Sequence, residues 1–157
     1  MSAHDRAAYA ARQAQLLDAL LRGDDYPEGF AAAQADAAGQ ALRRKRGRAV
    51  KHAWPALAVA LGGQFDERFD PFARAVDAPP SGDALADGLA FARWLRRRPD
   101  APQLGDQARA EWLLARAALR RHGVFAAAAW LRTPRRRLLV VARLPGAGAL
   151  RLTLPPR

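Results

Sequence analysis

The chain has 157 residues, half of them hydrophobic, and carries a formal net charge of +11. It has no cysteine, which excludes disulfides, thiolate metal sites and thiol nucleophiles. No apolar run is long enough to cross a membrane, and charges interrupt the N-terminal segment where a signal peptide is apolar, so we expect a cytoplasmic protein with no membrane partner.

Residues 1–98 show the periodicity and the boundary signals of about five helices. Gly23 is expected to end the first helix, because glycine is favoured just past a helix C-terminus. Proline is favoured in the first turn, so Pro55 is expected to begin the third. Pro71 lies inside the fourth pattern and predicts a kink or a split. The expected helices run from Ser2 to about Arg22, from about Phe30 to Ala53 and from Pro55 to Leu61, the fourth contains Phe65, Phe69 and Phe72, and the fifth, capped by Ser81 or Asp83, buries Leu85, Leu89, Trp94 and Leu95.

Two prolines and a glycine at residues 99–105 predict a linker. Beyond it, Asp106 is expected to cap a helix with an apolar stripe at Ala108, Trp112, Ala115 and Leu119. The period then changes to that of strands, at residues 124–131, 137–144 and 150–154. The predicted fold is α+β: a helical domain at 1–98, then a module at 106–157 in which one helix packs on a three-stranded antiparallel sheet.

The alternation of side chains along the strands predicts which face of this sheet is open. On the last strand, Leu150, Leu152 and Leu154 are expected to pack on the helix. On the middle strand, the residues expected to pack inward are Leu138, Val140, Ala142 and Leu144. An outer face with an apolar centre and basic ends would be suited to binding. Its expected residues are Arg137, Leu139, Val141 and Arg143, with Arg151 and Thr153 beside them.

Positive charge is concentrated near the C-terminus. Residues 107–157 hold eleven arginines and one acid, Glu111, a balance of +10, whereas residues 1–106 balance to +1. A concentrated positive field favours an acidic partner. A second basic run on a predicted helix cannot lie wholly on one face, so some of its cations are expected to be structural, with Asp36, Asp66, Glu67 and Asp70 as candidate partners. The expected charged docking residues are Arg43, Arg44, Lys45, Arg46, Arg48, Arg120 and Arg121.

Reactive groups in catalytic spacing are missing from the sequence. The three histidines, at 4, 52 and 122, lie in separate elements, and neither serine has the partners of a hydrolytic triad. No glycine-rich loop precedes a helix that begins with Lys-Ser or Lys-Thr. The paired carboxylates at 24–25 and 66–67 lie in turn or cap contexts rather than in a glycosidase arrangement. We therefore expect no enzyme activity, metal site or cofactor in this chain.

One segment carries a recognisable pattern. Residues 45–62 read KRGRAVKHAWPALAVALG, and they are followed by Phe65, Phe69 and Phe72 and by DGLAFARWL at 87–95. Over about residues 10–97 the chain resembles a bacterial family labelled as a DNA-binding domain. It is most similar to the actinobacterial branch, which has the pattern KRxRxVxxxWPxLxxxLG.

The resemblance implies a partner protein rather than an enzyme. Members are commonly encoded beside multinuclear non-heme iron oxidative enzymes (MNIO), which modify ribosomally made peptides. It implies that this chain forms a heterodimer with such an enzyme and presents the leader part of an acidic precursor peptide, while the iron belongs to the enzyme. An extended peptide can pair with an exposed strand edge, and the edge expected here is residues 124–131 or 150–154.

Three alternatives remain open from the sequence. The sheet can be purely structural and cap the helical domain. The chain can be a DNA-binding regulator, since a helix followed by a basic hairpin resembles a winged helix, with residues 135–137 as the wing. It can also be a scaffold whose basic surface docks an acidic protein without any peptide.

Overall fold

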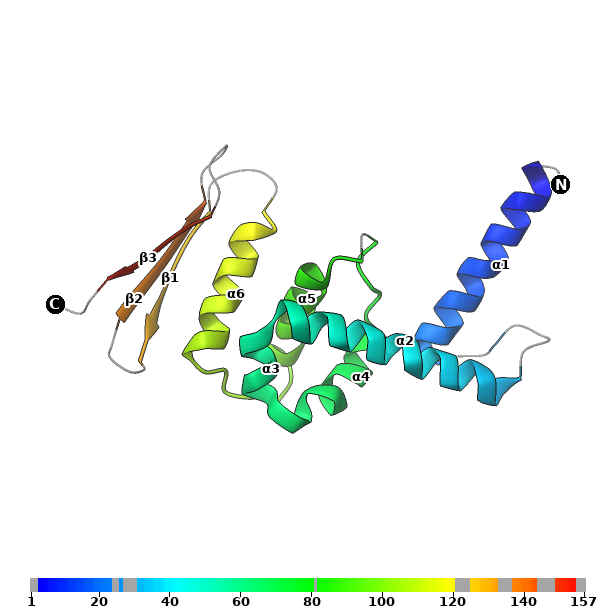
Figure 1. Cartoon of the computed structure of the whole chain (residues 1–157), viewed down its shortest axis with the longest axis horizontal. Helices are drawn as coiled ribbons and strands as arrows, with labels where there is room; N and C mark the ends of the chain where they lie inside the picture. The colour runs from blue at the N-terminus through cyan, green and yellow to red at the C-terminus, as the bar shows by residue number, and fades with distance from the viewer. Residues whose placement is uncertain are drawn as a thin grey trace. The chain divides into compact units, whose positions relative to one another are not determined.

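The computed structural model describes residues 3–23, 26, 31–80, 82–120, 125–132, 137–143 and 149–154. In this part of the chain the helices precede a three-stranded antiparallel sheet, which confirms the predicted α+β class (Figure 1). The elements are α1 (Ala3–Arg22), α2 (Ala32–Ala53), α3 (Pro55–Leu61), the 3-10 turn η1 (Gly62–Gln64), α4 (Phe65–Ala75), α5 (Ala84–Arg96), α6 (Asp106–Ala118), β1 (Phe125–Leu131), β2 (Arg137–Arg143) and β3 (Ala149–Leu154).

The predicted boundary residues lie where the helices begin and end. Gly23 follows α1 with a φ of 75°, and Gly62 follows α3 with a φ of 51°, a region that glycine enters without steric cost. Pro55 is the first residue of α3, and Asp83 caps α5 by accepting the N–H groups of Leu85 and Ala86. The split predicted at Pro71 is wrong, because α4 runs continuously through that residue.

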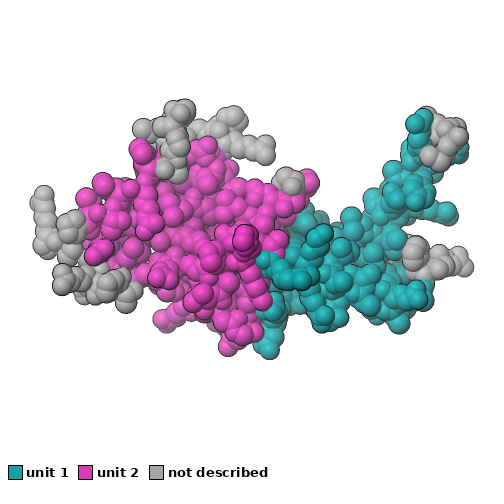
Figure 2. Space-filling model, viewed as in Figure 1, with its two compact units in different colours: residues 1–48, 66–78 teal, residues 49–65, 79–157 magenta. Residues whose placement is uncertain are grey.

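The chain divides into two compact units, drawn in different colours in Figure 2. The first comprises residues 1–48 and 66–78, with α1, most of α2 and most of α4. The second comprises residues 49–65 and 79–157, with α3, α5, α6 and the sheet. Residues 79–98 and 106–157 thus belong to one unit, because α6 packs on α3 and α5 as well as on the sheet. The predicted linker at 99–105 stays a prediction.

The helical core of the second unit is built on the Trp-Pro pattern. Trp54 is fully buried, and its indole Nε1 donates a hydrogen bond to the carbonyl of Leu85 at 3.1 Å. Phe65 and Phe91 are also fully buried, and their rings meet edge to face with centroids 5.4 Å apart. The pattern of the family resemblance is therefore a packing pattern.

Gly88 is required by this packing. It lies on α5, and a Cβ atom there would come within 2.1 Å of the Trp54 Nε1 atom. Because the indole is enclosed on all sides, we expect Gly88→Ala to lower the free energy of unfolding by about 2–3 kcal/mol. Urea denaturation would measure the loss. Gly63→Ala is the control, since nothing lies within 4 Å of a Cβ at that position. Equal stability of the two variants would contradict this packing.

α6 is the central element of the second unit and is buried on two sides. Ala110, Leu113 and Ala117 form one core cluster with three buried residues of the sheet, Phe125, Leu139 and Val141. On another side, the Glu111 carboxylate accepts the backbone N–H groups of Ala56 and Leu57 at 3.2 and 2.8 Å. It thereby caps the start of α3, where the side chain of the N-cap residue, Trp54, makes no capping hydrogen bond. Figure 1 shows α6 between the sheet and α3.

Candidate functional site

The described strand residues on the side of the sheet away from α6 are all apolar. Residues paired across neighbouring antiparallel strands project to the same face, and successive residues alternate between faces. Trp130 pairs with Leu138, which pairs with Leu154, and the parallel rows are Ala128, Val140 and Leu152, and Ala126, Ala142 and Leu150. We call these nine residues the outer face. Trp130 is 59% exposed, and Leu150 and Leu152 are 57% and 56% exposed.

The predicted orientation of the sheet is wrong. Leu139 and Val141, expected on the open platform, are both fully buried against α6. Leu150, Leu152 and Leu154, expected to pack on the helix, are exposed. The two sets of alternating residues on β2 are both apolar. Because neither set is polar, the alternation does not indicate which set faces solvent. Leu138, Val140 and Ala142, expected inward, lie half-buried on the outer face.

The predicted cations of the platform lie on the α6 side of the sheet and do not form an open basic surface. Arg143 donates hydrogen bonds to the carbonyls of Ala117 and Ala118, where it satisfies the C-terminal end of α6. Arg137 is exposed at the opposite end of β2. Arg151 and Thr153 pair with Val141 and Leu139, so they share the α6 side of the sheet.

The strand β3 is accessible to solvent, although one of its sides faces α6. It pairs only with β2 and forms one edge of the sheet, and β1 forms the other. Leu150, Arg151, Leu152 and Thr153 are all exposed, so side chains of both faces of this strand reach solvent. On β1, by contrast, the inward residues pack against the core cluster around α6.

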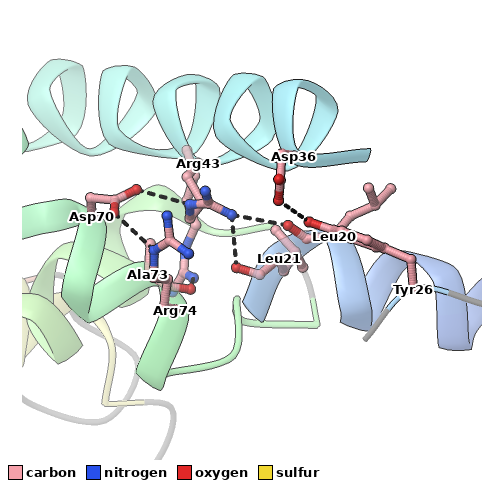
Figure 3. A network of polar contacts seen from close by, with 9 residues as sticks. Leu20, Leu21, Tyr26, Asp36, Arg43, Asp70, Ala73 and Arg74 are labelled. Atoms are coloured by element: carbon pink, nitrogen blue, oxygen red, sulfur yellow. Dashed lines mark hydrogen bonds and ion pairs between the residues drawn. The ribbon is translucent and has the colours of Figure 1, made fainter. Parts of the chain in front are cut away.

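The basic run of α2 divides into a structural and an exposed set. Arg43 is 4% exposed, and its guanidinium bonds the Asp70 carboxylate at 2.8 Å and the carbonyls of Leu20 and Leu21 at 3.0 and 3.2 Å (Figure 3). Arg46 donates to the carbonyl of Val76 at 2.8 Å. The predicted docking role of Arg43 is therefore wrong, because the buried guanidinium joins α1, α2 and α4.

Of the four acids predicted as candidate partners, Asp70 is the one that pairs with Arg43. Burial alone would raise the pKa of Asp70, but hydrogen bonds from Arg74 and Arg43 outweigh it and lower that pKa below its usual value. Arg74 bonds the second carboxylate oxygen at 2.9 Å. The carboxylate therefore stays ionised and holds two guanidinium groups within the first unit.

Arg43→Met should destabilise the first unit. The change removes three hydrogen bonds and leaves the carbonyls of Leu20 and Leu21 without this donor. Asp70 is 43% exposed and can regain water, which limits the loss to about 1–3 kcal/mol. Thermal unfolding followed by circular dichroism measures it. Arg44→Met is the matched control, because Arg44 is exposed; an equal loss in both variants would contradict the structural role of Arg43.

Exposed cations remain on α2 and at the end of α6. Arg44, Lys45 and Arg48 are exposed on α2. Arg120 is exposed after α6, and its guanidinium lies 5.8 Å from the centre of the Phe125 ring. Arg121, the remaining predicted docking residue, lies outside the described residues. The exposed cations can contact phosphates or carboxylates, whereas Arg43 cannot.

A groove of about 950 Å³ runs beside α6 within the second unit. Ala56, Val59 and Ala60 of α3 form one wall, and Leu114 and Ala118 of α6 lie along it. Val59 is 79% exposed, and Arg151 of β3 also lines the groove. Glu111 lines it too, but its carboxylate oxygens are engaged by the backbone of α3.

The described part of the chain holds neither a metal-binding cluster nor a membrane-spanning helix. No three His, Asp or Glu residues lie close enough there to hold a metal ion. None of the described helices is long and apolar enough to cross a membrane. What the described residues do present is a sheet with an open apolar face and an accessible edge.

Fold and site together define an α+β protein with a helical part and a small sheet that is covered on one face. The family model described as SCO6045-like, C-terminal domain matches residues 10–97. The match spans more than half of the chain, and the chain belongs to this family. It covers the segment on which the sequence resemblance rested, and its description names neither a nucleic acid nor an iron enzyme. No curated protein and no solved structure matches the chain.

The residues of the outer face were missed by sequence reasoning. Trp130, which is 59% exposed, was not among the residues expected on an open face. A usable signal was present, since both alternating sets of the middle strand are apolar. A sheet that is apolar on both faces needs a cover on both faces.

Proposed function

We propose that this protein is a non-catalytic partner of a multinuclear non-heme iron enzyme and presents the enzyme's precursor peptide. The supporting observation is the edge strand β3, whose side chains are exposed on both faces and which pairs on one side only. An extended peptide can add to such an edge through backbone hydrogen bonds. The iron and its ligands belong to the enzyme, and both proteins would meet the peptide in the cytoplasm.

The contribution of the chain would be recognition and positioning. The expected peptide is acidic, and Arg151 on β3 offers a guanidinium that makes no hydrogen bond or ion pair with the described residues. A carboxylate of the peptide placed beside Arg151 would set its register, while backbone pairing supplies affinity. This replaces the predicted platform at Leu139 and Val141, which are buried.

A DNA-binding regulator is the second candidate, favoured by the exposed cations Arg44, Lys45 and Arg48 on α2. Contacts between these cations and DNA phosphates would not depend on the base sequence. They would weaken steeply as the salt concentration rises, because binding releases counterions from the phosphates.

The test is co-purification of this chain with a multinuclear non-heme iron enzyme and its precursor peptide, all expressed together. We expect a complex that survives moderate salt, and Arg151→Glu should weaken peptide binding about tenfold. Arg109→Glu is the matched control, since Arg109 is exposed on α6 and lines a different pocket, next to β1. Absence of a complex, together with salt-sensitive retention of generic duplex DNA, would replace the proposal with the regulator.

A further inference from the structure

The outer face departs from the usual pattern of a half-covered sheet. Antiparallel sheets with one solvent face normally alternate apolar residues inward with polar residues outward. Here the inward side holds Phe125, Leu139 and Val141, and the outer face contains no polar side chain at all. Large contiguous apolar patches are rare on soluble proteins unless they bind something. The sequence of the strands therefore suits a sheet that is covered on both sides.

The inner face shows what kind of element covers this sheet. There α6, a helix of 13 residues, lies against strands of six and seven residues. A helix of that length is about 20 Å long, and a seven-residue strand has about the same length. Ala110, Leu113 and Ala117 provide its contact stripe. A second helix of about four turns would cover the outer face in the same way.

Electrostatic repulsion argues against a second copy of this chain as the element that covers the outer face. Arg132 is exposed at the end of the sheet where Trp130 and Leu138 lie, and it forms no ion pair with a described residue. Residues 107–157 carry a balance of +10. Two such sheets face to face would bring like charges together, whereas acidic residues beside an apolar stripe would neutralise them.

We propose that the outer face is a docking surface for an amphipathic helix of a partner protein, with an apolar stripe flanked by Asp or Glu. Trp130, Leu138 and Leu152 contact the stripe, and Arg132 pairs with an acid beside it. This surface is separate from the β3 edge, so one chain can hold a peptide and a partner helix together. The inference rests on the sheet itself and not on the identity of the partner.

Binding to the outer face can be measured through the fluorescence of Trp130. The probe is a synthetic helical peptide of about 18 residues with a leucine stripe and flanking glutamates, because shorter helices are marginal in water. Titrated into the full chain, it should blue-shift the tryptophan emission and protect it from acrylamide. A peptide with lysine in place of each glutamate should bind at least tenfold more weakly. Leu152→Asp should weaken binding of the glutamate peptide at least tenfold.

Val59→Asp is the matched control, because Val59 is an exposed apolar residue on α3 and not on the sheet. Trp130→Gln, read by calorimetry, gives a second variant of the outer face. Unchanged binding by Leu152→Asp and Trp130→Gln would overturn the inference, as would equal binding of the lysine peptide. So would a stable dimer that Leu152→Asp dissociates, or binding to anionic phospholipid vesicles without binding of the peptide. None of these outcomes depends on the iron enzyme.

Discussion

Leu139→Asp is expected to unfold the sheet. Leu139 is fully buried between β2 and α6, next to Phe125 and Val141. The change removes about 2 kcal/mol of apolar burial. It also encloses a carboxylate without a cation or donor, which costs several kcal/mol more. We expect the free energy of unfolding to fall by about 4 kcal/mol or more, measured by urea denaturation with circular dichroism.

The matched variant carries the same chemical change on the other face. Leu152 lies one strand away on the outer face and is 56% exposed. An aspartate there stays hydrated, so Leu152→Asp should cost less than about 1 kcal/mol. If Leu152→Asp destabilised the protein as much as Leu139→Asp, the orientation of the sheet described above would be contradicted.

Trp54→Ala should cause the other large loss. The indole is fully buried, fills the space above Gly88 and donates to the carbonyl of Leu85. Its removal leaves a cavity and an acceptor without its donor, and we expect a loss of about 3–5 kcal/mol. Thermal and urea unfolding measure it.

Trp130→Ala is the control for the loss of an indole. Trp130 is 59% exposed, and its removal affects only contacts on the outer face, such as the pair with Leu138. We expect a change below about 1 kcal/mol. Wild-type stability of Trp54→Ala would mean that the indole does not hold α3 and α5 together.

The helical elements were largely predictable because their signals are local. A glycine with positive φ, a proline in a first turn and an Asp N-cap act within a few residues, and Gly23, Pro55 and Asp83 lie at such boundaries. Pro71 was the exception. α4 is helical on both sides of this proline, so the expected break is absent. Packing of Phe69 and Phe72 outweighs the single lost N–H donor.

The faces of the sheet were not predictable from the strands alone. Alternation identifies a buried face only when the two sets differ in polarity. Leu139 and Val141 are as apolar as Leu138 and Val140, so the choice depends on where α6 lies. The arginines of the strands also led to the wrong choice of the open face, for a related reason. A long side chain such as Arg143 can turn back to helix carbonyls and need not mark a solvent-exposed, functional face.

The basic residues of α2 were predictable in part. Helical geometry requires that Arg43 and Arg44 point to different sides, and the sequence predicted that some cations of the run are structural. Which of them is buried depends on Asp70 and on the carbonyls of α1, which lie far away in the sequence. Long-range partners of this kind carry no local signal.

The proposals assign separate tasks to two surfaces of one small sheet. The β3 edge would take an extended acidic peptide beside Arg151, and the outer face would take a helix of a larger partner. α6 supports both, because it packs on the sheet and also joins it to α3 and α5. The helices α3 and α5, which the family model covers, would then support α6 and the sheet within the second unit.

The most direct test of the proposed function is a reconstituted modification reaction. The purified iron enzyme and its precursor peptide are incubated with and without this chain, and the mass of the peptide is recorded. We predict modification with the wild-type chain and with Arg109→Glu, and at least a tenfold lower rate with Arg151→Glu or without the chain. Modification at the same rate in the absence of the chain would contradict its role as the presenting partner.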